Sequence, residues 1–109
     1  MIERRAEERI PTSLSVRIWG LDSNGERFEQ DAVARNISAG GALLSGINQQ
    51  LRPRDLIVVQ YQNNTASFRV VWTRPSENDQ KTLAAVHRRE ADECPWRELL
   101  REPASLRLR

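Results

Sequence analysis

Residues 14–25 read LSVRIWGLDSNG, and this stretch decides what kind of fold the chain can adopt. Leu14, Val16 and Ile18 alternate with residues of the opposite face, a period of two that is typical of a half-buried β-strand. The cluster that follows, Asp22-Ser23-Asn24-Gly25, contains the residue types that form hairpin turns. The stretch therefore predicts a strand that leads into a β-hairpin.

The hairpin predicts a second strand over about residues 26–37. Phe28 and Val33 are both apolar but have opposite parity along this segment. A strand in which the apolar face changes parity has usually gained one extra residue, so we expect a β-bulge between them.

The remainder of the chain continues as short apolar runs separated by polar turns. The first run follows a glycine-rich break at residues 38–41, and the next begins after Pro53-Arg54-Asp55. In the fifth segment Phe68, Val70 and Trp72 share one face. Six short strands at this spacing favour a small antiparallel barrel or sandwich. The four later segments are residues 42–44, 56–61, 66–72 and 83–87.

A short helix is predicted near the C-terminus, over residues 94–102. Pro95 can occupy the first helical turn without losing a hydrogen bond. Trp96, Leu99 and Leu100 then follow at helical spacing. A helix this short is not stable alone, so we expect its apolar face to pack on the barrel.

Composition predicts one soluble domain over residues 1–109. The chain has 39% hydrophobic and 29% charged residues, and no apolar run approaches the roughly 18 residues of a membrane span. The charged residues 1–9 do not resemble a signal peptide, and a single cysteine, Cys94, fits a reducing compartment. We therefore expect a cytoplasmic protein without membrane insertion.

The sequence offers no candidate for catalysis or metal binding. His87 is the only histidine, so neither a zinc site nor a histidine-based triad can be assembled from it in the usual way. No activating base accompanies Cys94, which we expect to fill space beside the helix start. The three tryptophans lie in three different segments, which fits core packing better than a stacking platform for nucleic acid. The chain is therefore predicted not to be an enzyme, with no cofactor.

Two motifs carry the functional argument. Arg5 and Arg9 form RxxxR, with Arg4 just before it, and residues 36–41 read NISAGG, which has the form NxSxxG. In this order and separated by one hairpin, they resemble the signature of the PilZ domain family. The resemblance extends to the six strands and the short final helix. It implies a six-stranded antiparallel β-barrel over residues 12–90, a flexible ligand-binding loop over residues 1–11, and binding of the bacterial second messenger cyclic di-GMP.

The chemistry of the arginines and of Asn36 agrees with that ligand, which carries two guanine bases and two phosphates. One arginine can bond to both O6 and N7 of guanine, and a guanidinium can also stack on the base. Arg5 and Arg9 could use both modes. The side-chain oxygen of Asn36 can accept a hydrogen bond from guanine N1–H or N2–H. The family resemblance implies that an arginine just before RxxxR, here Arg4, accompanies binding of a stacked pair of ligands, whose charge it would help to neutralise. The alternative, given equal weight, is that Arg4 is a solvated side chain.

The rest of the second motif is expected to serve the ligand as well. Ser38 could donate its hydroxyl to a phosphate or a base. Gly40 and Gly41 could adopt positive φ and let the ligand approach the backbone closely. The alternative for this segment is a plain turn or bulge with no ligand.

We therefore predict that the chain binds cyclic di-GMP and changes conformation to signal to a partner protein. As the resemblance implies, the partner would be a component of motility, secretion or polysaccharide synthesis. One alternative is a PilZ-fold interaction module without ligand binding. The other is a small basic barrel that binds nucleic acid, which the net charge of only +2 and the lack of a clustered basic stripe make unfavourable.

Overall fold

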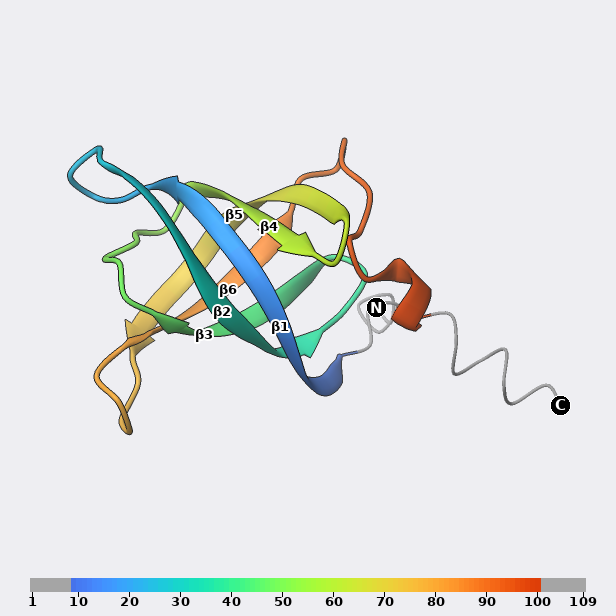
Figure 1. Ribbon diagram of the computed structural model, residues 1–109, viewed down its shortest axis with the longest axis horizontal. Coiled ribbons are helices and arrows are strands. Elements are labelled where there is room, and N and C mark those ends of the chain that lie inside the picture. The colour runs from blue at the N-terminus through green and yellow to red at the C-terminus, as the bar shows by residue number, and fades with distance from the viewer. Residues whose placement is uncertain (1–8, 101–109) are drawn as a thin grey trace, which may run out of the picture.

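The computed structural model describes residues 9–100. Six antiparallel strands form a closed barrel with the order β1-β2-β3-β6-β5-β4 (Figure 1). β1 pairs with both β2 and β4, and this second pairing closes the barrel. The strands are β1 (Ile10–Leu21), β2 (Arg27–Ile37), β3 (Gly41–Ile47), β4 (Leu56–Tyr61), β5 (Asn64–Pro75) and β6 (Thr82–Arg88). The prediction of a six-stranded antiparallel barrel is confirmed.

The β1–β2 hairpin forms where residues 22–25 predicted it. The side-chain oxygen Oδ1 of Asp22 accepts hydrogen bonds from the backbone N–H groups of Asn24 and Glu26, each at 2.9 Å. Gly25 has a φ of 80°, which a residue with a side chain rarely adopts. Local contacts within the turn therefore fix this end of the barrel.

The interior of the barrel is filled by the inward-facing residues of all six strands. In β1, Val16 and Ile18 are buried as the alternation predicted. Trp96 closes the core from outside the strands, with its ring centroid 5.5 Å from that of Phe68. The largest fully buried side chains are Trp96, Phe68, Ile18, Ile37, Leu44, Ile47, Ile57, Val59, Val70 and Pro95.

The irregularities of the strands differ from the predicted ones. The extra residue of β2 is not between Phe28 and Val33, since its pairing with β1 is regular there. The register between β2 and β3 shifts instead between Ala34 and Asn36. Val33 faces outward, and the shift at residue 35 lets both Ala34 and Ile37 point inward.

A second shift corrects the prediction for β5. The register between β5 and β6 changes between Val70 and Trp72. Phe68 and Val70 are buried, but Trp72 is 39% exposed, and the Arg74 guanidinium lies 5.0 Å from its ring centroid. Trp72 therefore does not share the inward face of Phe68 and Val70. Trp19 is only partly buried and is not part of the core either, so the interpretation of the tryptophans as core residues holds for Trp96 alone.

The C-terminal segment packs against the barrel as predicted. Within the described range, residues 97–100 are helical, a shorter stretch than the predicted residues 94–102, whose last two lie outside that range. Trp96, Leu99 and Leu100 contact the core, and Cys94 packs beside them. No helix among residues 9–100 is long and apolar enough to cross a membrane.

Candidate functional site

The NxSxxG segment links β2 to β3 at the end of the barrel where the chain enters β1 (Figure 1). Ser38 and Gly41 form its tight turn. The N–H of Ser38 donates to the Gly41 carbonyl at 2.9 Å, and the N–H of Gly41 donates to the Ser38 Oγ at 3.1 Å. The turn therefore has its own internal hydrogen bonds before any ligand is considered.

Asn36 and Arg9 meet on the outside of the barrel. The register shift after Ala34 turns Asn36 away from the core, and its backbone pairs with Pro11 of β1. The Arg9 Nη1 donates a hydrogen bond to the Asn36 Oδ1 at 2.5 Å. The structure thus joins one residue of each sequence motif directly, although they are 27 positions apart.

The guanidinium of Arg9 has more donors than this contact uses. Arg9 is exposed, and among residues 9–100 its guanidinium donates only to Asn36, from one nitrogen. An arginine carries five N–H groups, and an amide oxygen has two lone pairs, so neither group is saturated by this contact. The hydrogen bond to Asn36 can hold the planar guanidinium of Arg9 in place. The other N–H groups of the guanidinium could then bind a base or a phosphate.

Three successive carbonyl groups of the loop are held by residues far along the chain. The Trp96 Nε1 donates to the Ser38 carbonyl at 2.9 Å. Arg88 donates from Nε to the Ala39 carbonyl at 2.9 Å and from its backbone N–H to the Gly40 carbonyl at 2.7 Å. These bonds fix the loop from the end of β6 and from the C-terminal segment. Because its carbonyls face these partners, the loop has a defined orientation.

The N–H groups of the loop differ from its carbonyl groups in their hydrogen bonding. Within residues 9–100, the N–H groups of Ala39 and Gly40 donate to no acceptor. Backbone N–H groups in a turn provide positive partial charge that suits an anionic or carbonyl acceptor. The loop can therefore offer donors next to the Arg9–Asn36 pair.

Ser38 and the two glycines lie differently from what we expected. Ser38 is only 2% exposed, and its hydroxyl lies within hydrogen-bond distance of the Gly41 backbone. Positive φ occurs at Gly25 and Gly46, not at Gly40 or Gly41, so the predicted backbone conformation of these two is wrong. Gly41 is needed for space instead, because a Cβ built there would lie 2.5 Å from the Val86 carbonyl oxygen.

Sequence reasoning missed Arg88 and Trp96 as residues that hold the site. Arg88 follows the last predicted strand and resembled any other surface arginine. The helical spacing identified Trp96 as a docking residue, but no signal connected its indole N–H with a carbonyl 58 positions earlier. Arg4 and Arg5, the other predicted site residues, lie outside the described residues.

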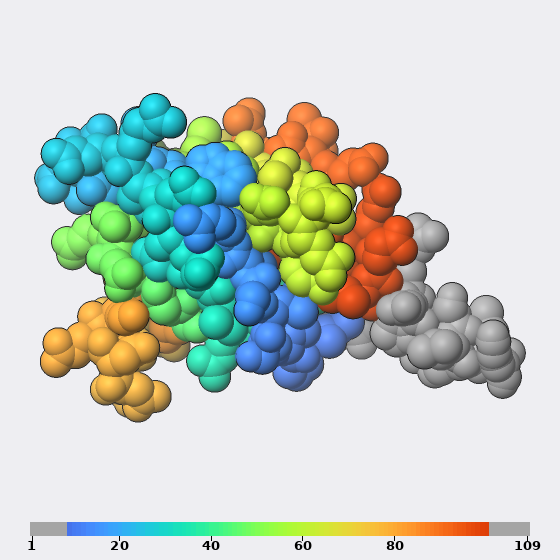
Figure 2. Space-filling model, viewed as in Figure 1, coloured from blue at the N-terminus to red at the C-terminus, as the bar shows by residue number. Residues whose placement is uncertain are grey.

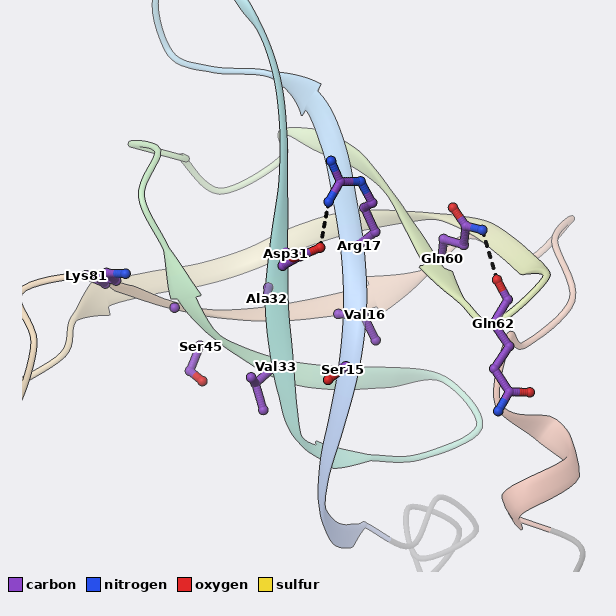
Figure 3. A pocket seen from close by; sticks show the side chains of 11 residues that line it. Ser15, Val16, Arg17, Asp31, Ala32, Val33, Ser45, Gln60, Gln62 and Lys81 are labelled. Carbon is purple, nitrogen blue, oxygen red and sulfur yellow. Dashed lines mark hydrogen bonds and ion pairs between the residues drawn. The ribbon is translucent and has the colours of Figure 1, made fainter.

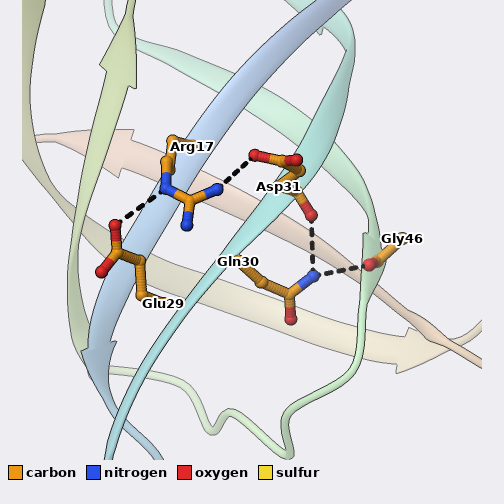
Figure 4. Close-up of polar contacts among 5 residues, drawn as sticks. All are labelled: Arg17, Glu29, Gln30, Asp31 and Gly46. Atoms are coloured by element: carbon orange, nitrogen blue, oxygen red, sulfur yellow. Dashed lines mark hydrogen bonds and ion pairs between the residues drawn. The ribbon is translucent and has the colours of Figure 1, made fainter.

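A hollow of about 530 Å³ on the outer face of the barrel is a weaker candidate (Figure 3). Two cations, Arg17 and Lys81, line it, and Arg17 donates to Glu29 at 2.8 Å and to Asp31 at 2.6 Å (Figure 4). These two carboxylates raise the pKa of Arg17 above its ordinary value. An arginine already held by two carboxylates does not favour an anionic ligand.

A comparison with known protein families gives a match over most of the chain. The family model of the PilZ domain matches residues 3–102, which include both motifs and all six strands. No curated protein matches the chain.

Proposed function

The chain belongs to the PilZ domain family, and we propose from that premise that it is a receptor for cyclic di-GMP. PilZ domains are binding modules rather than enzymes, so the family implies a ligand-controlled surface instead of a catalysed reaction. The contact between Arg9 and Asn36 is the observation that carries the proposal. It joins the two motifs at one place on the barrel.

The Arg9 guanidinium would engage guanine O6 and N7, and the Asn36 oxygen would accept from the base or keep Arg9 in position. The N–H groups of Ala39 and Gly40, which have no acceptor within residues 9–100, would serve a phosphate or a carbonyl of the same ligand. Arg4 and Arg5 would add the remaining positive charge. Ser38 would act by shaping the turn, because its hydroxyl already contacts Gly41.

Signalling to a partner follows from the way the loop is held. Its carbonyls are bonded to Arg88 and Trp96, so a ligand that shifts the loop also pulls on the C-terminal segment. The Arg88 Nη1 in turn donates to the Asp92 carbonyl at 2.5 Å, which extends the connection. The partner would be an effector of motility, secretion or polysaccharide synthesis, and the site of action the cytoplasm.

Calorimetric titration of the full chain with cyclic di-GMP tests the proposal. We expect the parent to bind, and Arg9→Ala to weaken binding about 10- to 100-fold, since a bidentate guanine contact is worth about 1–3 kcal/mol. Arg52→Ala, at an exposed arginine away from the site, is the matched control and should bind as the parent does. The same titration gives the stoichiometry, which Arg4→Leu should reduce from two ligands to one.

Two results would contradict the proposal. If the folded parent does not bind cyclic di-GMP, the chain is an interaction module without a ligand. If a random oligonucleotide binds as tightly as cyclic di-GMP and Arg9→Ala affects both equally, the small basic barrel that binds nucleic acid is the better interpretation. GTP serves as the control for simple guanine binding.

A further inference from the structure

Four apolar side chains form a cluster on the outside of the barrel, here called the outer apolar patch: Trp19 and Leu21 in β1, Leu56 and Val58 in β4. Trp19 pairs directly with Val58 across the two strands. Gly20 pairs with Ile57 at the next position, and Leu21 and Leu56 come directly after this pair. Leu21 is 53% exposed and Leu56 is 46% exposed. Side chains opposite one another on the same face of a sheet are in contact distance, so the four form one surface.

Arginines flank the outer apolar patch on both sides. Arg27 of β2 pairs with Leu21, and Arg69 of β5 pairs with Leu56. Both arginines are exposed, and neither forms an ion pair with another residue of the range 9–100. Arg17, which precedes Leu21 by four residues in β1, differs from these two arginines because it forms ion pairs with two carboxylates (Figure 4).

A hollow adjoins the patch on the β2 side. It has a volume of about 640 Å³, and Trp19, Leu21 and Arg27 all line it. Glu29 lines it as well but is held by Arg17, whereas Arg27 forms no ion pair within residues 9–100. An apolar wall beside such a cation is suited to a group that combines an apolar side chain with a carboxylate. The hollow makes the surface beside the patch concave.

The geometry limits how a protein could cover this surface. At the outer apolar patch, β1 is paired with both β2 and β4, and β4 is paired with both β1 and β5, so no strand edge is free there for another strand to add. A partner must therefore contact the patch through side chains. A helix can do so without exposing unpaired backbone groups to the apolar surface.

From these features we propose that the outer apolar patch is a docking surface for a helix of another protein, with an apolar stripe bordered on both sides by carboxylates. The stripe would cover Leu21 and Leu56, and the carboxylates would reach Arg27 and Arg69. Charge complementarity selects this occupant, because Arg27 and Arg69 flank the patch and form no ion pair with the described part of the chain.

The other possible occupants fit less well. A second copy related by a two-fold axis would bring arginine flanks against arginine flanks. Residues 101–109 contain three arginines and one glutamate, which gives the same conflict. Residues 1–8 span at most about 28 Å, whereas β1 carries the chain roughly 36 Å from its start to Leu21.

The patch and the nucleotide site lie at opposite ends of β1. Arg9 precedes the first residue of the strand, and Leu21 is its last. Figure 2 shows the β1–β2 hairpin projecting on the side away from the C-terminal segment. The proposal does not depend on nucleotide binding, so either one can fail without the other.

The probe for the test is a stapled synthetic helix with leucines on one face and glutamates along both borders of that face. A second helix has lysines in place of the glutamates. We expect the glutamate helix to shift the amide resonances of β1 and β4 in the full chain, both without and with saturating cyclic di-GMP. The lysine helix should leave them unchanged, and added salt should weaken the glutamate helix.

Two variants of similar exposure sharpen the test. Leu56→Ser should weaken binding of the glutamate helix at least about tenfold, as expected for the centre of an interface. Val71→Ser is the matched control, since Val71 is 51% exposed but lies outside the patch, and it should bind within about twofold of the parent. Circular dichroism confirms that both variants are folded.

Three results would overturn the proposal. The lysine helix could bind as well as the glutamate helix, which would remove the role of the arginines. The parent could sediment as a dimer that Leu56→Ser dissociates, which would make a second copy the occupant. Deletion of residues 101–109 could be required before the glutamate helix binds, which would make the chain's own tail the occupant.

Discussion

The two ends of the barrel are held together in different ways. At the hairpin end, Asp22 and Gly25 form a turn from contacts within five residues. At the site end, the loop of residues 38–41 depends on Arg88 and Trp96, which lie about half the chain away. The hairpin end is therefore held mainly by local contacts, whereas the loop at the site end combines its own Ser38–Gly41 hydrogen bonds with bonds from distant segments.

The glycines of the two ends show the same contrast. Gly25 is required for its φ of 80°, and a Cβ there would meet nothing within 4 Å. Gly41 has an ordinary φ but no room, because the Val86 carbonyl oxygen would be 2.5 Å from a Cβ. Gly25 is needed because of its own backbone conformation, whereas Gly41 is needed because the neighbouring strand β6 leaves no room for a side chain.

The largest effect is expected for Gly41→Val. The added side chain would force β3 away from β6 at the position where Gly41 pairs with His87. We expect a loss of about 3 kcal/mol or more in the free energy of unfolding, measured by urea denaturation. Loss of ligand binding would then follow from damage to the fold rather than from obstruction of the ligand.

Gly25→Ala is the matched change at the hairpin end. It strains only the turn, so we expect a loss of about 1 kcal/mol and an intact nucleotide site. Equal losses for the two variants would show that Gly41 has more room than the structure gives it.

A middle-sized effect is expected for Trp96→Phe. Phenylalanine keeps most of the aromatic packing on Phe68 but removes the indole donor of the Ser38 carbonyl, which then has the weak 4.0 Å contact from the Cys94 Sγ in its place. A poorly satisfied buried acceptor costs about 1–3 kcal/mol, and the loop should bind cyclic di-GMP more weakly. Thermal unfolding and titration measure the two effects. Trp19→Phe, at the other end of the barrel, should leave titration unchanged, and a parent-like result for Trp96→Phe would mean that its indole N–H is dispensable.

The smallest effect concerns the thiol beside the site. Burial raises the pKa of Cys94 above its ordinary value, so the thiol stays protonated across neutral pH. We expect iodoacetamide to modify the folded chain much more slowly than the chain in urea, with the rate rising only at strongly alkaline pH. Mass spectrometry follows the reaction. Rapid labelling of the folded chain near pH 7 would show that the C-terminal segment opens away from Ser38.

The sequence was sufficient for those parts of the fold that depend on local patterns. The alternation of Leu14, Val16 and Ile18 predicted β1, and residues 22–25 predicted the hairpin. Both follow from short-range chemistry. The bulge at residue 35 was misplaced because Val33, although apolar, faces outward, and apolar character alone does not report which face a residue occupies.

Trp72 shows the same limit. Its parity with Phe68 and Val70 predicted burial, but a register shift in β5 turned it outward. Such a shift depends on the partner strand, which period-two patterns do not describe.

The candidate site, too, could be predicted from the sequence only in part. The two motifs identified Arg9 and Asn36, and the structure brings them together. The motifs could not show that Gly41 is constrained by Val86, or that Arg88 and Trp96 hold the loop carbonyls. These are tertiary contacts between segments that carry no shared pattern.

The dependence of residues 38–41 on distant partners has a consequence for biosynthesis. Arg88 and Trp96 bond to carbonyls that precede them by 49 and 58 positions. The ribosome therefore synthesises residues 38–41 well before it synthesises Arg88 and Trp96, which bond to them. At about 5–20 residues per second, that interval lasts several seconds. A nascent chain whose Trp96 is still inside the exit tunnel would have the residues of its hairpin but not the bonds that fix residues 38–41.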